Sequence, residues 1–208
     1  MRVAGVDEAG CGPLAGPVVA AAVVFPKNWL AAGLPAKFRG LNDSKQLKAE
    51  EREKFFERIQ SDPEIQFAVA IVDVETIDRI NIRQAAWRAM DQALNELQPR
   101  AEHVLVDGLR IHWLAYPQTP LVEGDARSYS IAAASVLAKV TRDRIMRELD
   151  KQFPGYGFAE HKGYLTRQHS AAIEKLGACP IHRKSFAPFK PKEPELFDSS
   201  LMAQSPRA

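Results

Sequence analysis

The sequence GVDEAGCGPLAGPVV occupies residues 5–19 and joins two apolar segments of strand length. The first segment, residues 2–6, predicts a short strand that ends at the acids Asp7 and Glu8. The second segment, residues 18–25, is an almost uninterrupted apolar run, which is typical of a strand buried on both faces. The Gly- and Pro-rich residues between them predict a tight turn. This stretch therefore predicts two strands of a buried sheet, with two acids at the end of the first.

Strand and helix patterns continue along the chain. The further predicted strands are residues 67–72, residues 103–106 and, more weakly, residues 111–115. The predicted helices are residues 44–59, residues 76–97, residues 130–151 and residues 166–176. Residues 26–40 are expected to form a loop, and Ser44 is expected to cap the first helix. Because strands come first and helices gather towards the end, we expect a three-layer α/β domain with a helical C-terminal subdomain.

The composition is that of an ordinary soluble domain. Of 208 residues, 46% are hydrophobic and 26% are charged, so extensive disorder is not expected. The formal net charge of +2 does not by itself indicate a nucleic-acid partner. Basic residues gather in residues 139–190, which hold eleven Lys and Arg against five Asp and Glu. A basic face suits a polyanion, although a solvated helical surface explains this excess equally well.

The two cysteines, Cys11 and Cys179, make neither a disulfide framework nor the clustered spacing of a zinc site. They favour a reducing, cytoplasmic setting. No stretch approaches the roughly 20 apolar residues that span a bilayer, and no signal-peptide pattern opens the chain. We expect a cytoplasmic protein without a membrane partner, and we expect it to be a monomer.

Four acids stand where a predicted element begins or ends: Asp7, Glu8, Asp107 and Asp125. Sites in open α/β sheets assemble at the carboxyl ends of strands. Carboxylate oxygens are the ligands that Mg²⁺ and Mn²⁺ prefer, and two such ions about 3.5–4 Å apart can drive phosphodiester hydrolysis. The acids therefore predict a site for Mg²⁺ or Mn²⁺. The alternative is that each is a turn residue or a helix cap, and for Asp125 alone that alternative is the better one.

The pair Asp7 and Glu8 raises a geometric difficulty, because successive side chains of a regular strand point to opposite faces. Both can face one ion only if the chain bends beside them. Gly10 and Gly12 provide that freedom. We therefore expect a bend at this point.

Residues 5–19 resemble the opening signature of ribonuclease HII, the type 2 ribonuclease H of bacteria. The resemblance covers about residues 2–189. Its further blocks are Asp43-Ser44-Lys45, Val106-Asp107-Gly108, Gly124-Asp125-Ala126-Arg127-Ser128 with residues 130–143, residues 156–164 (YGFAEHKGY), and His182-Arg183-Lys184-Ser185-Phe186. Five further blocks in the same order make the resemblance very specific.

The resemblance implies an α/β fold of the ribonuclease H type, with a five-stranded mixed sheet flanked by helices. It implies that Asp7, Glu8, Asp107 and Asp125 are the catalytic, metal-binding set. Family members hydrolyse the RNA strand of RNA–DNA hybrids and incise at single ribonucleotides embedded in duplex DNA, which leaves 3′-hydroxyl and 5′-phosphate ends. This incision starts the removal of misincorporated ribonucleotides.

The resemblance also implies a contact to the ribose 2′-hydroxyl, the group that distinguishes RNA from DNA. The family uses the backbone of a Gly-Arg-Gly turn and a tyrosine. These positions are Gly10, Cys11, Gly12 and Tyr164 here. Without the motif, Tyr164 would be taken as an ordinary half-buried aromatic residue.

This sequence departs from the family at Cys11, where the family usually has arginine, and at Glu123, where it often has lysine. Cys11 lacks a guanidinium that could hold a phosphate, so we expect weaker binding or discrimination with the chemistry retained. Glu123 is expected to point into solvent. The candidate phosphate contacts are Lys45, Lys139, Arg142 and Lys162. An ion pair with Asp143, four residues along, is a serious alternative role for Lys139.

We predict a catalytic domain over residues 1–151, a helical subdomain packed on it over residues 152–189, and a disordered tail over residues 190–208.

Two other functions stay open. One is another nuclease of the same fold, such as a resolvase or an RNA-only ribonuclease H, against which Tyr164 argues. The other is a nucleic-acid-binding protein with little catalysis, which only Cys11 makes plausible.

Overall fold

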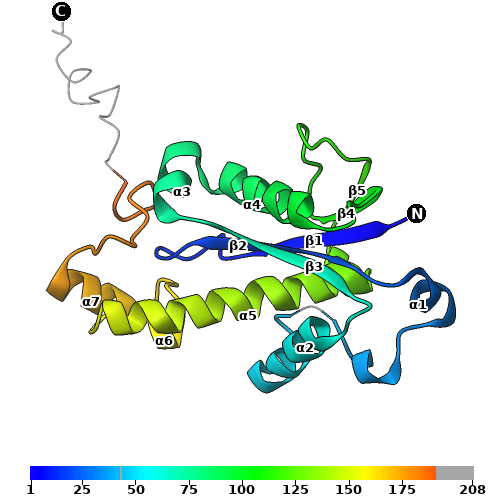
Figure 1. Ribbon diagram of the computed structural model, residues 1–208. Coiled ribbons are helices and arrows are strands. Elements are labelled where there is room, and N and C mark those ends of the chain that lie inside the picture. Colours follow the sequence, from blue (N-terminus) through cyan, green and yellow to red (C-terminus); the bar gives the residue numbers. More distant parts are fainter. Residues whose placement is uncertain (43, 191–208) are drawn as a thin grey trace, which may run out of the picture.

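The computed structural model describes residues 1–42 and 44–190, and its centre is a five-stranded sheet in the order β3-β2-β1-β4-β5 (Figure 1). The strands are β1 (Val3–Ala9), β2 (Val18–Val24), β3 (Gln66–Val72), β4 (His103–Asp107) and β5 (Gln118–Leu121). β2 runs antiparallel to both β1 and β3, whereas β1, β4 and β5 are parallel to one another. The mixed five-stranded sheet is therefore confirmed.

Helices cover the sheet on two sides (Figure 1). The helices are α1 (Lys27–Ala32), η1 (Ala36–Phe38), α2 (Ala49–Ser61), α3 (Val74–Ile80), α4 (Ile82–Glu96), η2 (Gly124–Ala126), α5 (Tyr129–Gln152), α6 (Phe158–His161) and α7 (Arg167–Leu176). α3 and α4 lie on one face of the sheet, and α2 and α5 lie on the other. The three layers expected from the order of elements are confirmed.

β2 is buried along its whole length because it lies between these two helical layers. Val18, Ala20 and Ala22 join the core shared with α4. Val19 and Ala21, on the opposite face, join the core shared with α5. Small residues at the centre of the strand let both helices approach the sheet closely, which explains why an apolar run without alternation forms this strand.

The predicted fifth strand at residues 111–115 is wrong. β5 is Gln118–Leu121, three residues beyond that segment, and it pairs with β4 in parallel. The amide side chain of Gln118 binds the backbone of Ile111 from both sides, accepting from its N–H at 2.9 Å and donating to its carbonyl at 2.8 Å. Ile111 is fully buried, so the apolar residue that suggested a strand is instead part of a loop whose side chain packs in the core.

The predicted single helix over residues 76–97 is two helices, α3 and α4, separated at Asn81. Asn81 adopts φ 68°, and its Oδ1 accepts a hydrogen bond from Gln84 N at 3.1 Å. An asparagine tolerates this left-handed region and caps a helix well. The apolar period continues across the break because both helices pack on the same core.

Two expectations for residues 26–59 are also wrong. The expected loop contains α1 and η1, whose aromatic residues Trp29 and Phe38 pack together with 5.7 Å between ring centroids. Ser44 does not cap α2, which begins at Ala49 after Lys48. The Ser44 hydroxyl is buried instead and lies 2.7 Å from the hydroxyl of Ser135 on α5.

The C-terminal segment packs against the end of α5. Tyr156, Phe158 and Cys179 share a small core with Met146 of α5 and Ala15 of the turn before β2. The division of domains at residue 151 stays a prediction, and the predicted tail lies outside the described residues apart from Lys190. Across residues 1–42 and 44–190, no helix has the length and apolar character needed to cross a membrane.

Candidate active site

β1 stays regular through both of its acids, because Asp7 pairs with Ala21 and Glu8 with Ala20 of β2. The bend expected beside them comes only after Ala9, where Gly10 adopts φ 104°. Asp7 therefore lies on the α5 side, and Glu8 shares a hollow with residues of α4. The bend therefore begins later than expected, but both acids line one cavity together with the turn that follows.

Asp107 and Asp125 lie near the same end of the sheet. Val106 of β4 is in register with Val6 of β1, so Asp107 follows beside Asp7. Asp107 Oδ1 accepts a hydrogen bond from Gly124 N at 2.8 Å, and this bond ties β4 to η2. Asp125 is buried in η2, where its Oδ1 accepts from Ala126 N at 2.9 Å. It lines a separate hollow with Asn42 and residues 126–129.

Burial and neighbouring carboxylates raise the pKa of both Asp7 and Glu8. Burial raises the pKa of Asp7 well above its ordinary value, and the charges of Glu8 and Asp107 raise it further. Burial also raises the pKa of Glu8, against a lowering by the hydrogen bond from Cys11. Uncompensated negative charge of this kind is relieved by a cation.

The donor set suits a hard divalent cation, because every candidate ligand is a carboxylate oxygen. Within residues 1–42 and 44–190, however, no group of three or more His, Cys, Asp or Glu side chains is arranged so that it could hold a metal ion. Asp107 and Asp125 keep hydrogen bonds to backbone N–H groups of η2 instead. An ion would therefore have to draw these side chains together.

Cys11 lies in the turn beside the acids. Its thiol donates a hydrogen bond to Glu8 Oε1, with 3.4 Å between the sulfur and the oxygen. Burial and the charge of Glu8 raise the pKa of the Cys11 thiol far above its usual range. The thiol stays protonated near neutral pH, so Cys11 is not a nucleophile here.

A cavity of about 320 Å³ gathers most of the predicted site residues. Its lining comprises Asp7, Glu8, Gly10, Cys11, Gly12, Lys45, Lys139, Arg142 and Tyr164, together with Ala9, Ser44 and Ser135. The ring of Tyr164 stands over the turn, since a methyl group on Gly12 would lie 3.5 Å from Tyr164 Cε1. Asp107, Asp125 and Lys162 do not line this cavity.

The four candidate phosphate contacts differ in their surroundings. Lys45 and Lys139 face the cavity, and Lys139 Nζ pairs with Asp143 Oδ1 at 2.8 Å, which confirms the alternative considered for it. Arg142 is buried and donates to the carbonyl oxygens of Pro17, Lys162 and Ala15 at 3.0–3.1 Å. The Lys162 ammonium donates to carbonyls of its own short helix, α6. Arg142 is therefore placed for a structural role, contrary to its expected phosphate contact, whereas Lys162 is partly exposed and its phosphate contact stays a prediction.

Sequence reasoning missed Ser135 and gave Arg183 no role. Ser135 is buried on α5 and hydrogen-bonds to Asp7. A polar residue within an apolar stretch of helix is a signal that could have revealed it. Arg183 is fully buried and binds carbonyl oxygens of the turn after β1. It lies outside regular structure, so no periodicity marked it.

Three buried histidines form a cluster that is hydrogen-bonded to the backbone of Tyr164. His182 Nδ1 accepts from Cys179 N at 2.9 Å, so its Nε2–H donates to His169 Nε2 at 3.1 Å. His169 Nδ1–H then donates to the carbonyl oxygen of Tyr164 at 3.0 Å. His161 stacks on His169 with 4.4 Å between centroids. This chain of donors requires His169 and His182 to be neutral, because a further proton would place two N–H groups face to face.

We expect acid to destabilise this part of the chain. Burial, with smaller contributions from His161 and His182, lowers the pKa of His169 to about 4. A histidine with a lowered pKa in the folded state takes up its proton more readily when unfolded. Stability is therefore complete above about pH 6.5 and is lost as the pH falls towards 4. The expected loss is on the order of 1–3 kcal/mol, measured by urea unfolding across this range.

The matched control replaces a histidine outside this cluster. His169→Gln should flatten the pH dependence between pH 6.5 and 4, whereas His103→Gln should leave it as in the wild type. An equal slope in the wild type and in His169→Gln would show that His169 does not cause the effect.

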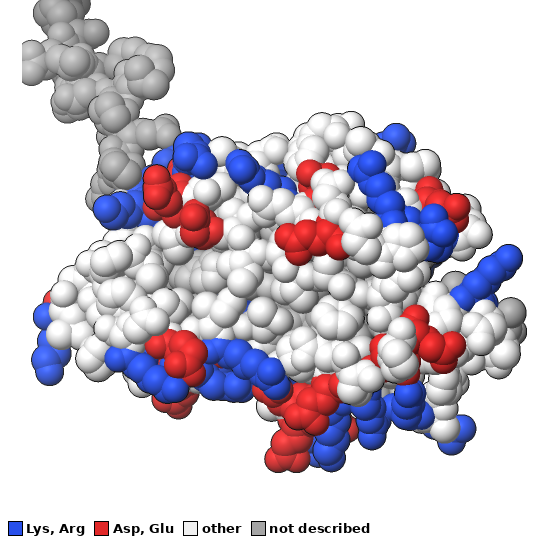
Figure 2. All heavy atoms as spheres, viewed as in Figure 1, with Lys and Arg blue, Asp and Glu red and all other residues white. Residues whose placement is uncertain are grey.

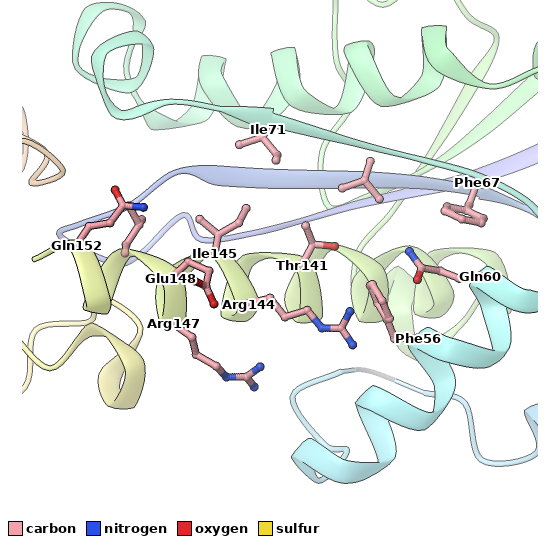
Figure 3. Close-up of a pocket in the computed structure, with 12 residues that line it drawn as sticks. Phe56, Gln60, Phe67, Ile71, Thr141, Arg144, Ile145, Arg147, Glu148 and Gln152 are labelled. Carbon is pink, nitrogen blue, oxygen red and sulfur yellow. The ribbon is translucent and has the colours of Figure 1, made fainter.

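A larger cavity, with a volume of about 750 Å³, lies elsewhere (Figure 3). It runs along β3 between α2 and α5, and Phe56, Phe67, Ile71 and Ile145 contribute apolar walls. None of the predicted site residues lines it. On the face seen in Figure 2, charges of both signs are interspersed around an uncharged centre, so this face presents no continuous basic surface. The smaller cavity with the acids is the better functional candidate.

A mixed five-stranded sheet between helical layers, with acids at the ends of its central parallel strands, defines a ribonuclease H-like α/β domain. Comparison with solved structures agrees. The ribonuclease H2 of Pyrococcus horikoshii OT3 superposes with a TM-score of 0.75 at 27% identity, which covers 91% of this chain and 95% of that one. A ribonuclease HIII in complex with Mn²⁺ shares the fold with a TM-score of 0.62 at 20% identity, over 91% of this chain and 68% of that one.

The profile of the Ribonuclease HII family matches residues 4–189. The ribonuclease HII of Anaeromyxobacter sp. (strain Fw109-5) is 51% identical over 201 residues, which are 94% of this chain and 61% of that relative. The chain thus spans less than two thirds of that protein. The ribonuclease HII of Geobacter metallireducens is 53% identical over 184 residues, which are 88% of this chain and 83% of that relative. This chain belongs to the ribonuclease HII family, a family of metal-dependent endoribonucleases.

Proposed function

We propose that this chain hydrolyses the RNA strand of RNA–DNA hybrids and incises duplex DNA on the 5′ side of single embedded ribonucleotides. The observation that carries the proposal is the cavity in which Asp7 and Glu8 adjoin the Gly10-Cys11-Gly12 turn and Tyr164. A group of acids offers a place for phosphodiester chemistry, and the turn and the tyrosine offer a place for a ribose. Recognition and cleavage would thus occur side by side.

Asp7, Glu8, Asp107 and Asp125 are the residues that would hold Mg²⁺ or Mn²⁺, with two ions when substrate is bound. Bound there, such ions would supply a Lewis acid for activating a water molecule and for stabilising the leaving 3′ oxygen, so that the products would carry 3′-hydroxyl and 5′-phosphate ends. Within the chain, Ser135 orients the carboxylate of Asp7 through its hydroxyl. The bond from Gly124 N holds the carboxylate of Asp107 at η2.

The duplex would lie across the mouth of the cavity. Lys45 and Lys139 would contact phosphates, which positions a strand without reading its sequence. The half-exposed ring of Tyr164 is available for stacking at the junction between the ribonucleotide and the DNA. We place this activity in the cytoplasm, as the first step of removing misincorporated ribonucleotides by a monomer. Neither cysteine forms a disulfide, which agrees with a reducing compartment.

One assay tests the proposal. Three end-labelled duplexes of the same sequence are compared: one with a single ribonucleotide, one RNA–DNA hybrid and one of DNA alone. Each is titrated with Mg²⁺ and with Mn²⁺, and EDTA serves as the control. We expect a single incision 5′ of the ribonucleotide, several cuts in the hybrid and no cleavage of DNA.

Other outcomes would favour other functions. Cleavage of the hybrid alone would indicate an RNA-only ribonuclease H, and cleavage of plain DNA would indicate a nuclease of another specificity. Binding without cleavage at any metal concentration would contradict the proposal altogether.

Cys11→Arg should strengthen substrate binding. Cys11 lies in the cavity wall, where a guanidinium could reach a phosphate that the thiol cannot hold. A charge-assisted hydrogen bond of about 1 kcal/mol corresponds to a KM roughly five-fold lower. We expect kcat to change less than about two-fold, because the variant adds a contact and leaves the acids in place.

Cys11→Ser is the matched control, since a hydroxyl can still donate to Glu8 but carries no charge. It should bind as the wild type does. If Cys11→Arg leaves both KM and the preference for the ribonucleotide junction unchanged, cysteine does not weaken recognition here.

A further inference from the structure

Arg183 lies against the turn that follows β1, and its side chain is fully buried. Its guanidinium donates to Gly10 O at 2.6 Å, to Cys11 O at 3.1 Å and to Gly16 O at 2.8 Å. A further bond reaches Pro17 O at 3.3 Å. A buried cation requires partners that replace its lost water, and here backbone carbonyls supply them. One side chain thus holds both ends of the turn.

These bonds decide where the amide groups of the turn point. In a planar trans peptide the C=O of one residue and the N–H of the next point in opposite directions. Because Gly10 O and Cys11 O point at Arg183, the N–H groups of Cys11 and Gly12 point away from it. Cys11 and Gly12 line the cavity and Arg183 does not, so these N–H groups face the cavity.

The backbone N–H groups of Cys11 and Gly12 have no hydrogen-bond acceptor among the described residues. Across residues 1–42 and 44–190, no hydrogen bond to the backbone N–H of Cys11 or Gly12 is found. Successive N–H groups that point into one hollow form a concave site for an oxygen or an anion. A ribose hydroxyl, or the phosphate beside it, has the chemistry to occupy this site.

Arg183 is itself held from α3. Asp78 accepts hydrogen bonds from Lys184 N and Ser185 N, both at 2.9 Å, and from Ser185 Oγ at 2.6 Å. The backbone N–H of Arg183 donates to Leu14 O at 2.8 Å. The segment that carries the arginine is thus fixed at α3 as well as at the turn.

Arg142, the other fully buried arginine, binds a different set of carbonyl oxygens. Its bonds go to the carbonyls of Ala15, Pro17 and Lys162, and none goes to Gly10 or Cys11. It joins the later part of the turn to the end of α6. Among the described residues, only Arg183 engages the two carbonyls whose peptides carry the open donors.

We infer that Arg183 is a positioning residue for ribonucleotide recognition, which aims the N–H groups of Cys11 and Gly12 at the sugar. The inference rests on the proposed function and deepens it. The planar guanidinium spreads several donors over separate carbonyls, which a lysine ammonium cannot do despite its equal charge. Loss of Arg183 therefore frees the peptide planes of the turn to rotate.

The test compares Arg183→Lys with Lys184→Ala, an exposed neighbour whose backbone contact to Asp78 is kept. Binding is measured in Ca²⁺ to a duplex with one ribonucleotide and to the all-DNA duplex of the same sequence. We expect Arg183→Lys to lose about ten-fold in its preference for the ribonucleotide duplex, because a hydroxyl loses its aligned partners. Affinity for plain DNA should stay within about two-fold, since phosphate contacts carry it. Lys184→Ala should match the wild type on both duplexes.

Kinetics in Mg²⁺ give a second readout. Arg183→Lys should raise KM about ten-fold and change kcat less than about three-fold, because the acids are untouched. A general structural defect would instead weaken binding to both duplexes alike. An equal loss on both duplexes, or an unchanged preference, would overturn the inference.

Asp78→Asn covers the case in which Arg183→Lys fails to fold. It removes a carboxylate that binds the segment of Arg183, and it does so from a position outside the core. It should lower the preference for the ribonucleotide duplex about three-fold. An unchanged preference would then count against the role of Arg183. A wild-type protein that shows no preference for the ribonucleotide duplex would contradict the proposed function. A wild-type preference that survives both substitutions would contradict only the role of Arg183.

Discussion

Asp7→Asn should lower metal-dependent cleavage by at least about 10³-fold, which is about 4 kcal/mol of transition-state stabilisation. Asp7 lies at the carboxyl end of the central strand β1, beside Asp107 and bonded to Ser135. An amide there has nearly the same shape but carries no charge with which to bind a cation. Cleavage of the single-ribonucleotide duplex in Mg²⁺ measures the effect.

The same substitution should stabilise the metal-free protein. Burial and the neighbouring acids make the Asp7 carboxylate unfavourable in the fold, and an amide removes that charge. We therefore expect a higher melting temperature in EDTA and a smaller increase on adding Mg²⁺ than in the wild type. A loss of activity combined with a gain in stability cannot be attributed to misfolding.

Glu123→Gln is the matched control for Asp7→Asn. Glu123 is an exposed acid two residues before Asp125, as expected from the sequence. Its neutralisation should change activity less than about two-fold, in line with a solvated side chain. Comparable activity of Asp7→Asn and the wild type would contradict the carboxylate site.

Gly5→Ala should destabilise the fold by about 3 kcal/mol or more, although it adds a single methyl group. A Cβ on Gly5 would lie 2.3 Å from the backbone nitrogen of Ile131 and 2.3 Å from the backbone carbon of Ser130. These atoms belong to the start of α5 and cannot move aside as a flexible side chain could. The melting temperature should fall by about 6–12 °C, or the protein should become insoluble.

Gly12→Ala offers a control within the same stretch. A Cβ there would meet Tyr164 at an ordinary contact distance of 3.5 Å, so stability should stay within about 0.5 kcal/mol. If both variants melt alike, the close approach of α5 to β1 is not essential to the fold.

The contact at Gly5 also serves the site. Gly5 and Asp7 share one face of β1, about 6.8 Å apart along the strand. Ile131 and Ser135 are four residues apart on α5, which is about one helical turn. Contact between Gly5 and Ile131 therefore brings Ser135 to Asp7. A glycine in a strand and a serine in a helix thus orient one carboxylate.

Local pattern was sufficient for much of the fold. The apolar runs at residues 18–25 and 67–72 predicted two strands correctly, because burial on a sheet dictates their composition. Local pattern failed at Asn81 and at residues 111–115. In both places an amide side chain binds backbone groups and overrides a continuous apolar pattern.

By itself, the sequence determined the class of the domain, the acids at the strand ends and the family. Each of these follows from short motifs and apolar patterns that are local in the chain. Only the tertiary structure decided what those residues face. It kept β1 regular through Asp7 and Glu8, gathered both acids in one cavity, and assigned Arg142 to the interior. It also brought Arg183 to Gly10, 173 residues away. Periodicity describes neighbours along the chain, whereas the turn after β1 is held by Arg183, a residue distant in sequence that only the packed fold brings to it.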